Sequence, residues 1–195
     1  MKRRLLLAEL RRHLTDPRVL EAMAAVPRER FVPTSLASDA WKNGPLPIGC
    51  GQTISQPLVV GRMCELLALT GDERILDVGT GSGYHAAILA RLGAHVWSIE
   101  RHEVLSRVAA RNLAGVDNVT LLVGDGTQGH PPEAPFDAIN VAASATTIPP
   151  ALTDQLAVGG RLVLPVGEQL VVVERTPSGL EQQGLERVRF VPLVS

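Results

Sequence analysis

A glycine-rich turn, GTGSG at residues 79–83, constrains the fold of this chain more than any other segment. The apolar run at 75–78 before it predicts a buried strand, and the helical pattern at 84–91 after it predicts a helix. A second strand is expected at 95–99 and ends on Glu100. A strand, a glycine turn, a helix and a second strand together make a βαβ unit, which binds nucleotide-like ligands beyond the carboxyl ends of its strands.

The residues around the turn distinguish between possible ligands. The dinucleotide fingerprint G-x-G-x-x-G requires a glycine three residues after Gly81, and that position is Tyr84. Asp77 lies at the strand end, where its carboxylate would repel a pyrophosphate. S-adenosylmethionine has no phosphate and carries an ammonium and a sulfonium group, so it suits Asp77 better. Glu100 follows the turn by about twenty residues, where a carboxylate can accept both ribose hydroxyls. The spacing favours S-adenosylmethionine, and NAD stays as an alternative.

The sequence after Glu100 alternates between strand and helix patterns. Strands are expected at 119–123, 136–141 and 161–165, and helices at 103–113 and 150–156. Two further strands, at 169–174 and 185–191, are joined too closely for a parallel crossover, so they are expected to be antiparallel. The predicted fold class is α/β: a Rossmann-like, doubly wound, mostly parallel sheet with an antiparallel edge, preceded by N-terminal helices.

The chain of 195 residues is expected to form a single domain. Residues 1–70 are expected to be a helical N-terminal region and a substrate loop, and residues 71–195 a cofactor-binding sheet with C-terminal strands. Helices are predicted around Leu6 to Leu14, from Asp16-Pro17 to Ala25, and at 58–69. The proline- and glycine-rich residues 32–57 predict irregular chain, and a loop this long is usually functional.

The composition is that of a globular protein, with 45% hydrophobic and 20% charged residues. The formal net charge of -1 gives no basic surplus for binding nucleic acid or an anionic membrane. No apolar run reaches the roughly 18 residues of a membrane span. Cys50 and Cys64 show no metal-ligand spacing, so we expect no metal site and a reducing compartment. We therefore expect a soluble, cytoplasmic protein.

Ligands of such sheets bind at the carboxyl ends of the strands, so the residues there are candidates for cofactor binding. They are Asp77, Gly79, Thr80, Gly81, Ser82, Glu100, Arg101, Gly124, Asp125 and Gly126. Asp125 follows a predicted strand, and its carboxylate can accept a hydrogen bond from an adenine amino group. A simple turn is the alternative role of Asp125-Gly126. The small residues at 142–145 leave room for a bulky substrate.

Several segments carry a resemblance to a known family. The block PLPIGCGQTISQP at 45–57 and the ending VRFVPL at 188–193 are the most specific of them. Matching segments also occur at 26–33, 77–84, 124–126, 135–139 and 159–163, so the similarity extends over nearly the whole chain. On these segments the sequence resembles the protein-L-isoaspartate O-methyltransferase family of class I S-adenosylmethionine-dependent methyltransferases.

The resemblance implies a single methyltransferase domain that uses S-adenosylmethionine. The family methylates the side-chain carboxylate of L-isoaspartyl residues in damaged proteins, which initiates repair through a succinimide. By this resemblance Ser55 is the active-site serine, and a helix N-cap is its alternative role. The acceptor is expected to contact Gln52, Thr53, Ile54, Ala143 and Val191. The apolar residues of the ending need cover, which leads to the hypothesis that it folds back over the site, with packing as an edge strand as the alternative. Isoaspartyl-containing proteins and peptides are the expected partners of a monomeric enzyme.

The sequence departs from the family pattern at three places. Cys50 stands where the family has histidine, Asp77 replaces the commoner glutamate, and residues 41–44 replace a more acidic and aromatic stretch. Because two of these changes fall in the substrate loop, a methyltransferase for another carboxyl or small-molecule acceptor stays as an alternative, as does a non-catalytic binding module. Asn43-Gly44 is an unhindered site for succinimide formation, which leads to the hypothesis that the protein generates its own substrate there.

Overall fold

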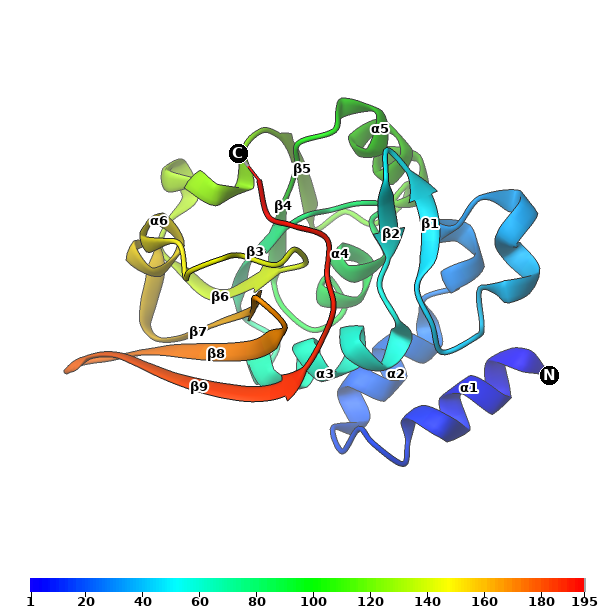
Figure 1. Ribbon diagram of the computed structural model, residues 1–195, viewed down its shortest axis with the longest axis horizontal. Coiled ribbons are helices and arrows are strands. Elements are labelled where there is room, and N and C mark those ends of the chain that lie inside the picture. The colour runs from blue at the N-terminus through cyan, green and yellow to red at the C-terminus, as the bar shows by residue number, and fades with distance from the viewer. Residues whose placement is uncertain (195) are drawn as a thin grey trace.

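The computed structural model describes residues 1–194, which are built around a seven-stranded sheet (Figure 1). The strands are β3 (Arg74–Val78), β4 (His95–Glu100), β5 (Val119–Val123), β6 (Phe136–Val141), β7 (Leu156–Val166), β8 (Gln169–Thr176) and β9 (Gly179–Arg187). Their order is β5-β4-β3-β6-β7-β8-β9. The first five strands in this order are parallel, β8 pairs antiparallel with β7, and β9 pairs antiparallel with β8. The predicted Rossmann-like sheet with an antiparallel edge is confirmed.

Helices cover both faces of the sheet, because its buried strands carry apolar side chains on both sides. Ile75 of β3 points into a core with the longer helices, whereas its neighbour Leu76 points into a second core on the other face. The first face is covered by α3 (Pro57–Leu67), α4 (Tyr84–Leu89) and α5 (Glu103–Asn112), and the second by α6 (Pro150–Asp154). Four short 3-10 helices complete the set: η1 (Arg28–Phe31), η2 (Thr34–Asp39), η3 (Gly126–Gln128) and η4 (Pro131–Glu133).

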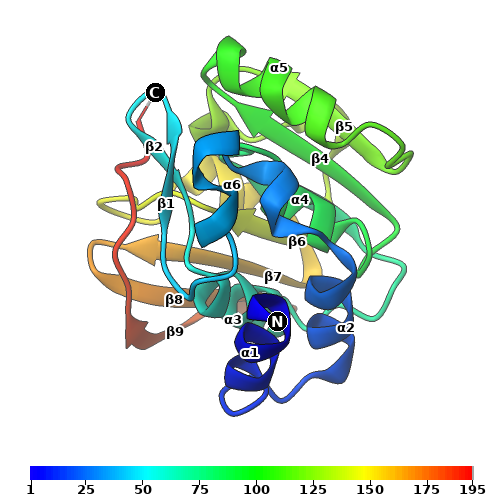
Figure 2. The same cartoon turned by 90° about the vertical axis from the view of Figure 1, so that its right-hand side faces the viewer.

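The N-terminal helices α1 (Lys2–Leu10) and α2 (Pro17–Ala25) pack outside this layer, with α2 against α3 and α4 (Figure 2). The helix α2 begins as its sequence predicts. The side chain of Asp16 is the N-cap and accepts a hydrogen bond from the amide of Arg18 at 2.8 Å, and Pro17 takes the first helical position. Within residues 1–194, none of the helices combines the length and apolar character that crossing a membrane requires.

Two predicted elements were wrong. The segment at 32–57 is not wholly irregular, because it contains a hairpin of β1 (Leu46–Gly49) and β2 (Gln52–Ile54). The hairpin forms where Gly49, Cys50 and Gly51 all take positive φ, which allows a tight reversal. The last strand spans Gly179–Arg187 instead of 185–191. It is an exposed edge strand with mostly polar residues, so it lacks the apolar pattern by which a strand is recognised.

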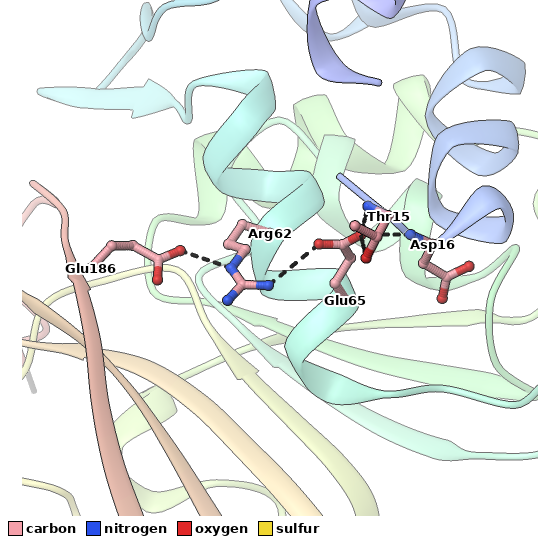
Figure 3. Close-up of polar contacts among 5 residues, drawn as sticks. All are labelled: Thr15, Asp16, Arg62, Glu65 and Glu186. Carbon is pink, nitrogen blue, oxygen red and sulfur yellow. Dashed lines mark hydrogen bonds and ion pairs between the residues drawn. The ribbon is translucent and has the colours of Figure 1, made fainter. Parts of the chain in front are cut away.

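A row of polar contacts ties α3 to both ends of the chain (Figure 3). Arg62 of α3 donates from Nε to Glu186 Oε1 of β9 at 2.9 Å. One turn further, Glu65 Oε1 accepts hydrogen bonds from the amides of Thr15 and Asp16 at 2.5 and 2.7 Å. The predicted active-site serine lies just before α3. These contacts therefore connect α3, the helix that follows this serine, to the N-terminal helices and the C-terminal hairpin.

Candidate active site

A cavity lies beyond the carboxyl ends of β3, β4 and β6, where the strand order reverses. Its lining includes the glycine turn after β3, Glu100 at the end of β4, and Ala142 and Ala143 after β6. The segment 52–55 and the C-terminal residues 191–194 complete it, the latter crossing the sheet as the red chain of Figure 1.

The glycine turn holds backbone conformations that glycine adopts readily. The φ angle is +94° at Gly79, +56° at Gly81 and +91° at Gly83. The amide of Gly79 donates to the carbonyl of Ile99 at 2.9 Å, which ties the turn to β4. A Cβ on Gly81 would lie 3.1 Å from Cδ1 of Ile48 in the hairpin. A side chain at Gly81 would therefore strain the turn and crowd the wall of the cavity.

Glu100 is oriented by two backbone amides. Its Oε2 accepts a hydrogen bond from Gly81 at 2.8 Å, and its Oε1 accepts one from His102 at 2.9 Å. The residue lines the cavity, although only 5% of its surface is exposed. Each carboxylate oxygen can accept a second hydrogen bond, so the two oxygens can receive a pair of ribose hydroxyls.

Asp77 is fully buried and does not line the cavity. Its Oδ2 accepts a hydrogen bond from the hydroxyl of Ser98, and its Oδ1 accepts one from Nδ2 of Asn140, both at 2.7 Å. Thr80 Oγ1 lies 2.6 Å from Ser98 Oγ. Because Ser98 uses its proton on Asp77, the Thr80 hydroxyl is the donor to Ser98. Asp77 therefore holds the glycine turn through Thr80 and Ser98, and it offers a ligand its charge instead of a direct contact.

His85 is a cavity residue that the sequence prediction missed. Its Nδ1 lies 3.2 Å from Nδ2 of Asn140, and its Nε2 lies 3.4 Å from Sγ of Cys64. Because Asn140 Nδ2 can only donate, His85 Nδ1 is the acceptor and the proton of the neutral ring is on Nε2. Burial lowers the pKa of His85, and the negative charge of Asp77 opposes that shift only in part. The sequence signal that could have identified His85 as a site residue was its position in the first turn of the helix after the glycine turn.

Most of the predicted site residues meet at this cavity. The predicted cofactor residues that line it are Gly79, Thr80, Gly81, Ser82, Glu100, Arg101 and Gly126. The predicted acceptor residues all line it: Gln52, Thr53, Ile54, Ser55, Ala143 and Val191. Asp77, Gly124 and Asp125 do not. The carboxylate of Asp125 accepts hydrogen bonds from the amide and the hydroxyl of Thr127 at 2.9 and 2.7 Å, which is the geometry of the turn.

Ser55 is not the N-cap of α3, because Gln56 takes that place. The amide of Leu58 in the first turn donates to Oδ1 of Asn43 at 3.1 Å, so another residue caps the helix. Among residues 1–194, Ser55 accepts a hydrogen bond through its carbonyl, from Arg28, while its hydroxyl bonds to no other residue. The hydroxyl is therefore available to a ligand.

A groove adjoins the cavity and shares part of its wall. Thr53, Ser55, Ala142 and Val191 line both spaces, so these four residues form the passage between them. The groove is otherwise lined by Pro45, Gln56, Val59, Glu168, Arg187, Val188, Arg189 and Phe190. The ending folds over the site because the amide of Ser144 donates to the carbonyl of Val191 at 2.8 Å and the amide of Leu193 donates to the carbonyl of Ser144 at 2.7 Å.

Comparisons with known proteins identify the family. The model of the family described as Protein-L-isoaspartate(D-aspartate) O-methyltransferase (PCMT) matches residues 1–195. Protein-L-isoaspartate O-methyltransferase 2 of Marinobacter nauticus is 53% identical over 191 residues, which cover 94% of this chain and 87% of that protein. The chain belongs to the protein-L-isoaspartate O-methyltransferase family.

Solved structures of this family share the fold. A protein-L-isoaspartate O-methyltransferase matches with a TM-score of 0.90 and 26% identity, covering 99% of this chain and 66% of that chain. A structure described as a protein-L-isoaspartate O-methyltransferase from Plasmodium falciparum, in complex with S-adenosyl-L-homocysteine, matches with a TM-score of 0.87 and 27% identity over 98% of both chains.

The cavity of this methyltransferase fits S-adenosylmethionine, the methyl donor of its family, better than the alternative NAD. Glu100 can receive ribose hydroxyls, and a Cβ on Gly79 or Gly81 would contact Ala142 or Ile48 in the cavity wall. The polar cluster of Asp77, Ser98 and Asn140 has more hydrogen-bond acceptors than donors. Asp77 is a carboxylate, and Oδ1 of Asn140 is buried without a partner among residues 1–194. Such a surplus suits a cationic ligand and disfavours a pyrophosphate.

Proposed function

We propose that this protein transfers a methyl group from S-adenosylmethionine to the side-chain carboxylate of L-isoaspartyl residues in damaged proteins, and so initiates their repair through a succinimide. The observation that carries the proposal is the free hydroxyl of Ser55 in the passage between the cavity and the groove. Membership of the family supports the reaction class, since the matching relatives are named for it.

The cavity is the half of the site that binds the methyl donor, and we call it the donor half. It holds its ligand with few charged groups. When bound, S-adenosylmethionine supplies a methyl group attached to a positively charged sulfur. Glu100 receives ribose hydroxyls while the amides of Gly81 and His102 keep its oxygens in place. The buried carboxylate of Asp77 favours positive charge in the cavity. Residues 191–194 cover the cavity and reduce the access of water.

The acceptor half has to orient a carboxylate. A carboxyl group with an unperturbed pKa of about 4 is ionised at neutral pH, so the site needs no general base. It must instead receive a carboxylate that leaves water and align it with the methyl group. The rotating hydroxyl of Ser55 and the positive end of α3 serve this purpose. Among the described residues no histidine bonds to the Ser55 hydroxyl, so we assign it an orienting role and not nucleophilic attack.

The departures from the family pattern lie away from the two spaces. Cys50 is exposed at the hairpin turn, and neither Cys50 nor any of residues 41–44 lines the cavity or the groove. A change of acceptor would require altered residues in contact with the acceptor. Because the substituted residues line neither space, we favour the isoaspartyl acceptor over another carboxyl or small-molecule acceptor.

Transfer of labelled methyl groups to a matched pair of isoaspartyl and aspartyl peptides tests the proposal. We expect label on the isoaspartyl peptide alone. Equal labelling of both peptides would point to another carboxyl acceptor, and calorimetry without S-adenosylmethionine binding would point to a non-catalytic module.

The role of Ser55 has its own test. Losing a hydrogen bond to a charged group costs roughly 1.5–3 kcal/mol, so Ser55→Ala should lower methyl transfer by about 10- to 100-fold. Its melting temperature should match that of the exposed control Ser35→Ala. Wild-type turnover in Ser55→Ala would remove the serine from the mechanism.

The proposal also covers the domain organisation, the oligomeric state, the cellular location and the partners of the protein. We infer a single methyltransferase domain over residues 1–195, because both core clusters pack against one sheet. We also infer a cytoplasmic monomer that acts on isoaspartyl-containing proteins without nucleic acid or membrane, in line with a formal net charge of -1. Sedimentation of the purified protein and fractionation of cells would check these points.

A further inference from the structure

Arg28 is among the largest fully buried side chains of the molecule, with 0% of its surface exposed. Its guanidinium donates to four backbone carbonyls: Ala40 at 2.5 Å, Lys42 at 3.4 Å, Gly44 at 3.0 Å and Ser55 at 3.0 Å. Among residues 1–194 no carboxylate forms an ion pair with it. A buried charge without a counter-ion is costly, and here carbonyl dipoles compensate for it.

The other side of Arg28 faces the donor half of the site. Its Cζ lies 5.7 Å from the ring centroid of Tyr84, close enough for a cation–π contact. Tyr84 is the first residue of α4, directly after the glycine turn, and it lines the cavity. Burial lowers the pKa of Arg28 to about 10, so the guanidinium stays charged at neutral pH. Arg28 thus lies between the Ser55 segment and the helix that follows the turn.

We propose that Arg28 is a positioning residue for the methyl transfer, which sets the place of Ser55 relative to the donor cavity. It binds the Ser55 carbonyl, joins that segment to the loop at 40–44, and rests against Tyr84 beside the glycine turn. Arg28 lines neither the cavity nor the groove, so it acts through Ser55 and not on the ligands. This inference rests on the proposed function, because the position of Ser55 matters only if Ser55 orients the acceptor.

The shape of arginine explains why this residue type is needed. A guanidinium has donors on separate nitrogens in a planar fork, so Nη1 reaches Ala40 and Lys42 while Nη2 reaches Gly44 and Ser55. A lysine has all its donors on one nitrogen and cannot reach both sides of the fork. Arg28→Lys therefore keeps the charge but loses part of the bridge.

Arg18, at an exposed position, provides a control for the loss of arginine–carbonyl hydrogen bonds. It too donates to backbone carbonyls, from Nη1 to Leu69 at 2.6 Å and from Nη2 to Leu92 at 3.3 Å. Neither Arg18 nor these partners line the cavity or the groove. Arg18→Lys and Arg18→Met therefore remove the same kind of bond at a place where no ligand binds.

The experiment measures three quantities for the full-length Arg28 and Arg18 variants: the Kd for S-adenosylmethionine, kcat and KM for an isoaspartyl peptide, and the melting temperature. A misplacement of about 1 Å can cost about 100-fold in rate, so we expect Arg28→Met to lose up to about 100-fold in kcat/KM and Arg28→Lys less. The Kd for S-adenosylmethionine should stay within a factor of about 3, which is less than 1 kcal/mol. The Arg18 variants should keep wild-type kcat/KM.

A second measurement shows whether Arg28 acts through Ser55. In the Ser55→Ala background, Arg28→Lys should cause little further loss of kcat/KM, because coupled residues are not additive. Additive losses, a Kd for S-adenosylmethionine that weakens in step with kcat/KM, or equal losses in the Arg18 variants would overturn the inference. If Arg28→Met does not fold, the comparison of Arg28→Lys with Arg18→Lys decides.

The proposed function can fail separately. No transfer to the isoaspartyl peptide by the wild-type enzyme refutes that function and the inference with it. Transfer by the wild-type enzyme together with wild-type kcat/KM in the Arg28 variants refutes the inference alone.

Discussion

Mild acid should destabilise this protein through His85. The neutral ring accepts a hydrogen bond from Asn140 at Nδ1 and carries its proton on Nε2, toward Cys64. Burial raises the pKa of the Cys64 thiol, so the sulfur stays protonated and offers the ring no negative charge. A proton added to Nδ1 would face the amide N–H of Asn140. Charging His85 therefore costs a hydrogen bond as well as the burial of a charge.

The size and sign of the effect follow from linkage. In the unfolded chain a histidine binds its proton with a pKa of about 6.5, and burial lowers the pKa of His85 in the folded protein. Below about pH 6.5 the unfolded state therefore binds more protons, and the free energy of unfolding falls by up to about 1.4 kcal/mol per pH unit until the folded pKa is reached. Above about pH 6.5 the stability is fully present.

Urea unfolding between about pH 7.5 and pH 5.5 measures this slope. His85→Gln removes the titrating group while keeping one acceptor and one donor, so its free energy of unfolding should vary less with pH than that of the wild type. His13→Gln, at an exposed histidine, is the control and should follow the wild type. Parallel curves for the wild type and His85→Gln would refute both the assigned tautomer and the cost of burial.

Three further predictions concern other parts of the structure. Glu100→Gln should weaken S-adenosylmethionine binding by about tenfold or more in calorimetry, because a hydrogen bond to a charged group is worth roughly 1.5–3 kcal/mol; an unchanged Kd would contradict its ribose role. Gly126→Ala should lower the free energy of unfolding in urea by about 1–3 kcal/mol, since its Cβ would lie 2.4 Å from a side-chain carbon of β3. Asn43 should stay intact in the aged folded protein, because its amide is hydrogen-bonded to Glu9 and Leu58 at 2.7 and 3.1 Å. Isoaspartate at position 43, found by peptide mass spectrometry, would instead support the self-substrate hypothesis.

The donor half of the site could be predicted because its determinants are local in sequence. Strand β3, the glycine turn, α4 and β4 follow one another within 74–100, and a short apolar run next to glycines identifies them. The approach of Glu100 to the turn follows from the parallel pairing of β3 and β4. No contact with distant parts of the chain is needed to place these residues together.

The surroundings of Asp77 could not be predicted in the same way. In the sheet Asp77 is paired with Ser98 of β4 on one side and with Asn140 of β6 on the other, so the polar cluster is a row across three parallel strands. A sequence gives the order of side chains along each strand but not the register between strands. The sequence therefore predicts a direct contact between Asp77 and an ammonium group. In the structure Asp77 instead belongs to a buried network, which can be identified only from the register between the strands.

The acceptor half depends on contacts between segments that lie far apart in the chain. Arg28, the hairpin before Ser55 and the ending at 188–194 reach the same place only in the folded protein. Because loop positions tolerate change better than the buried β3–β4 unit, substitutions in these segments should alter the acceptor more readily than the donor. The place of Ser55 is the exception, since the buried Arg28 binds its carbonyl. Variation of the acceptor in this scaffold is therefore expected along the groove at 187–190, where Arg187 and Arg189 are exposed.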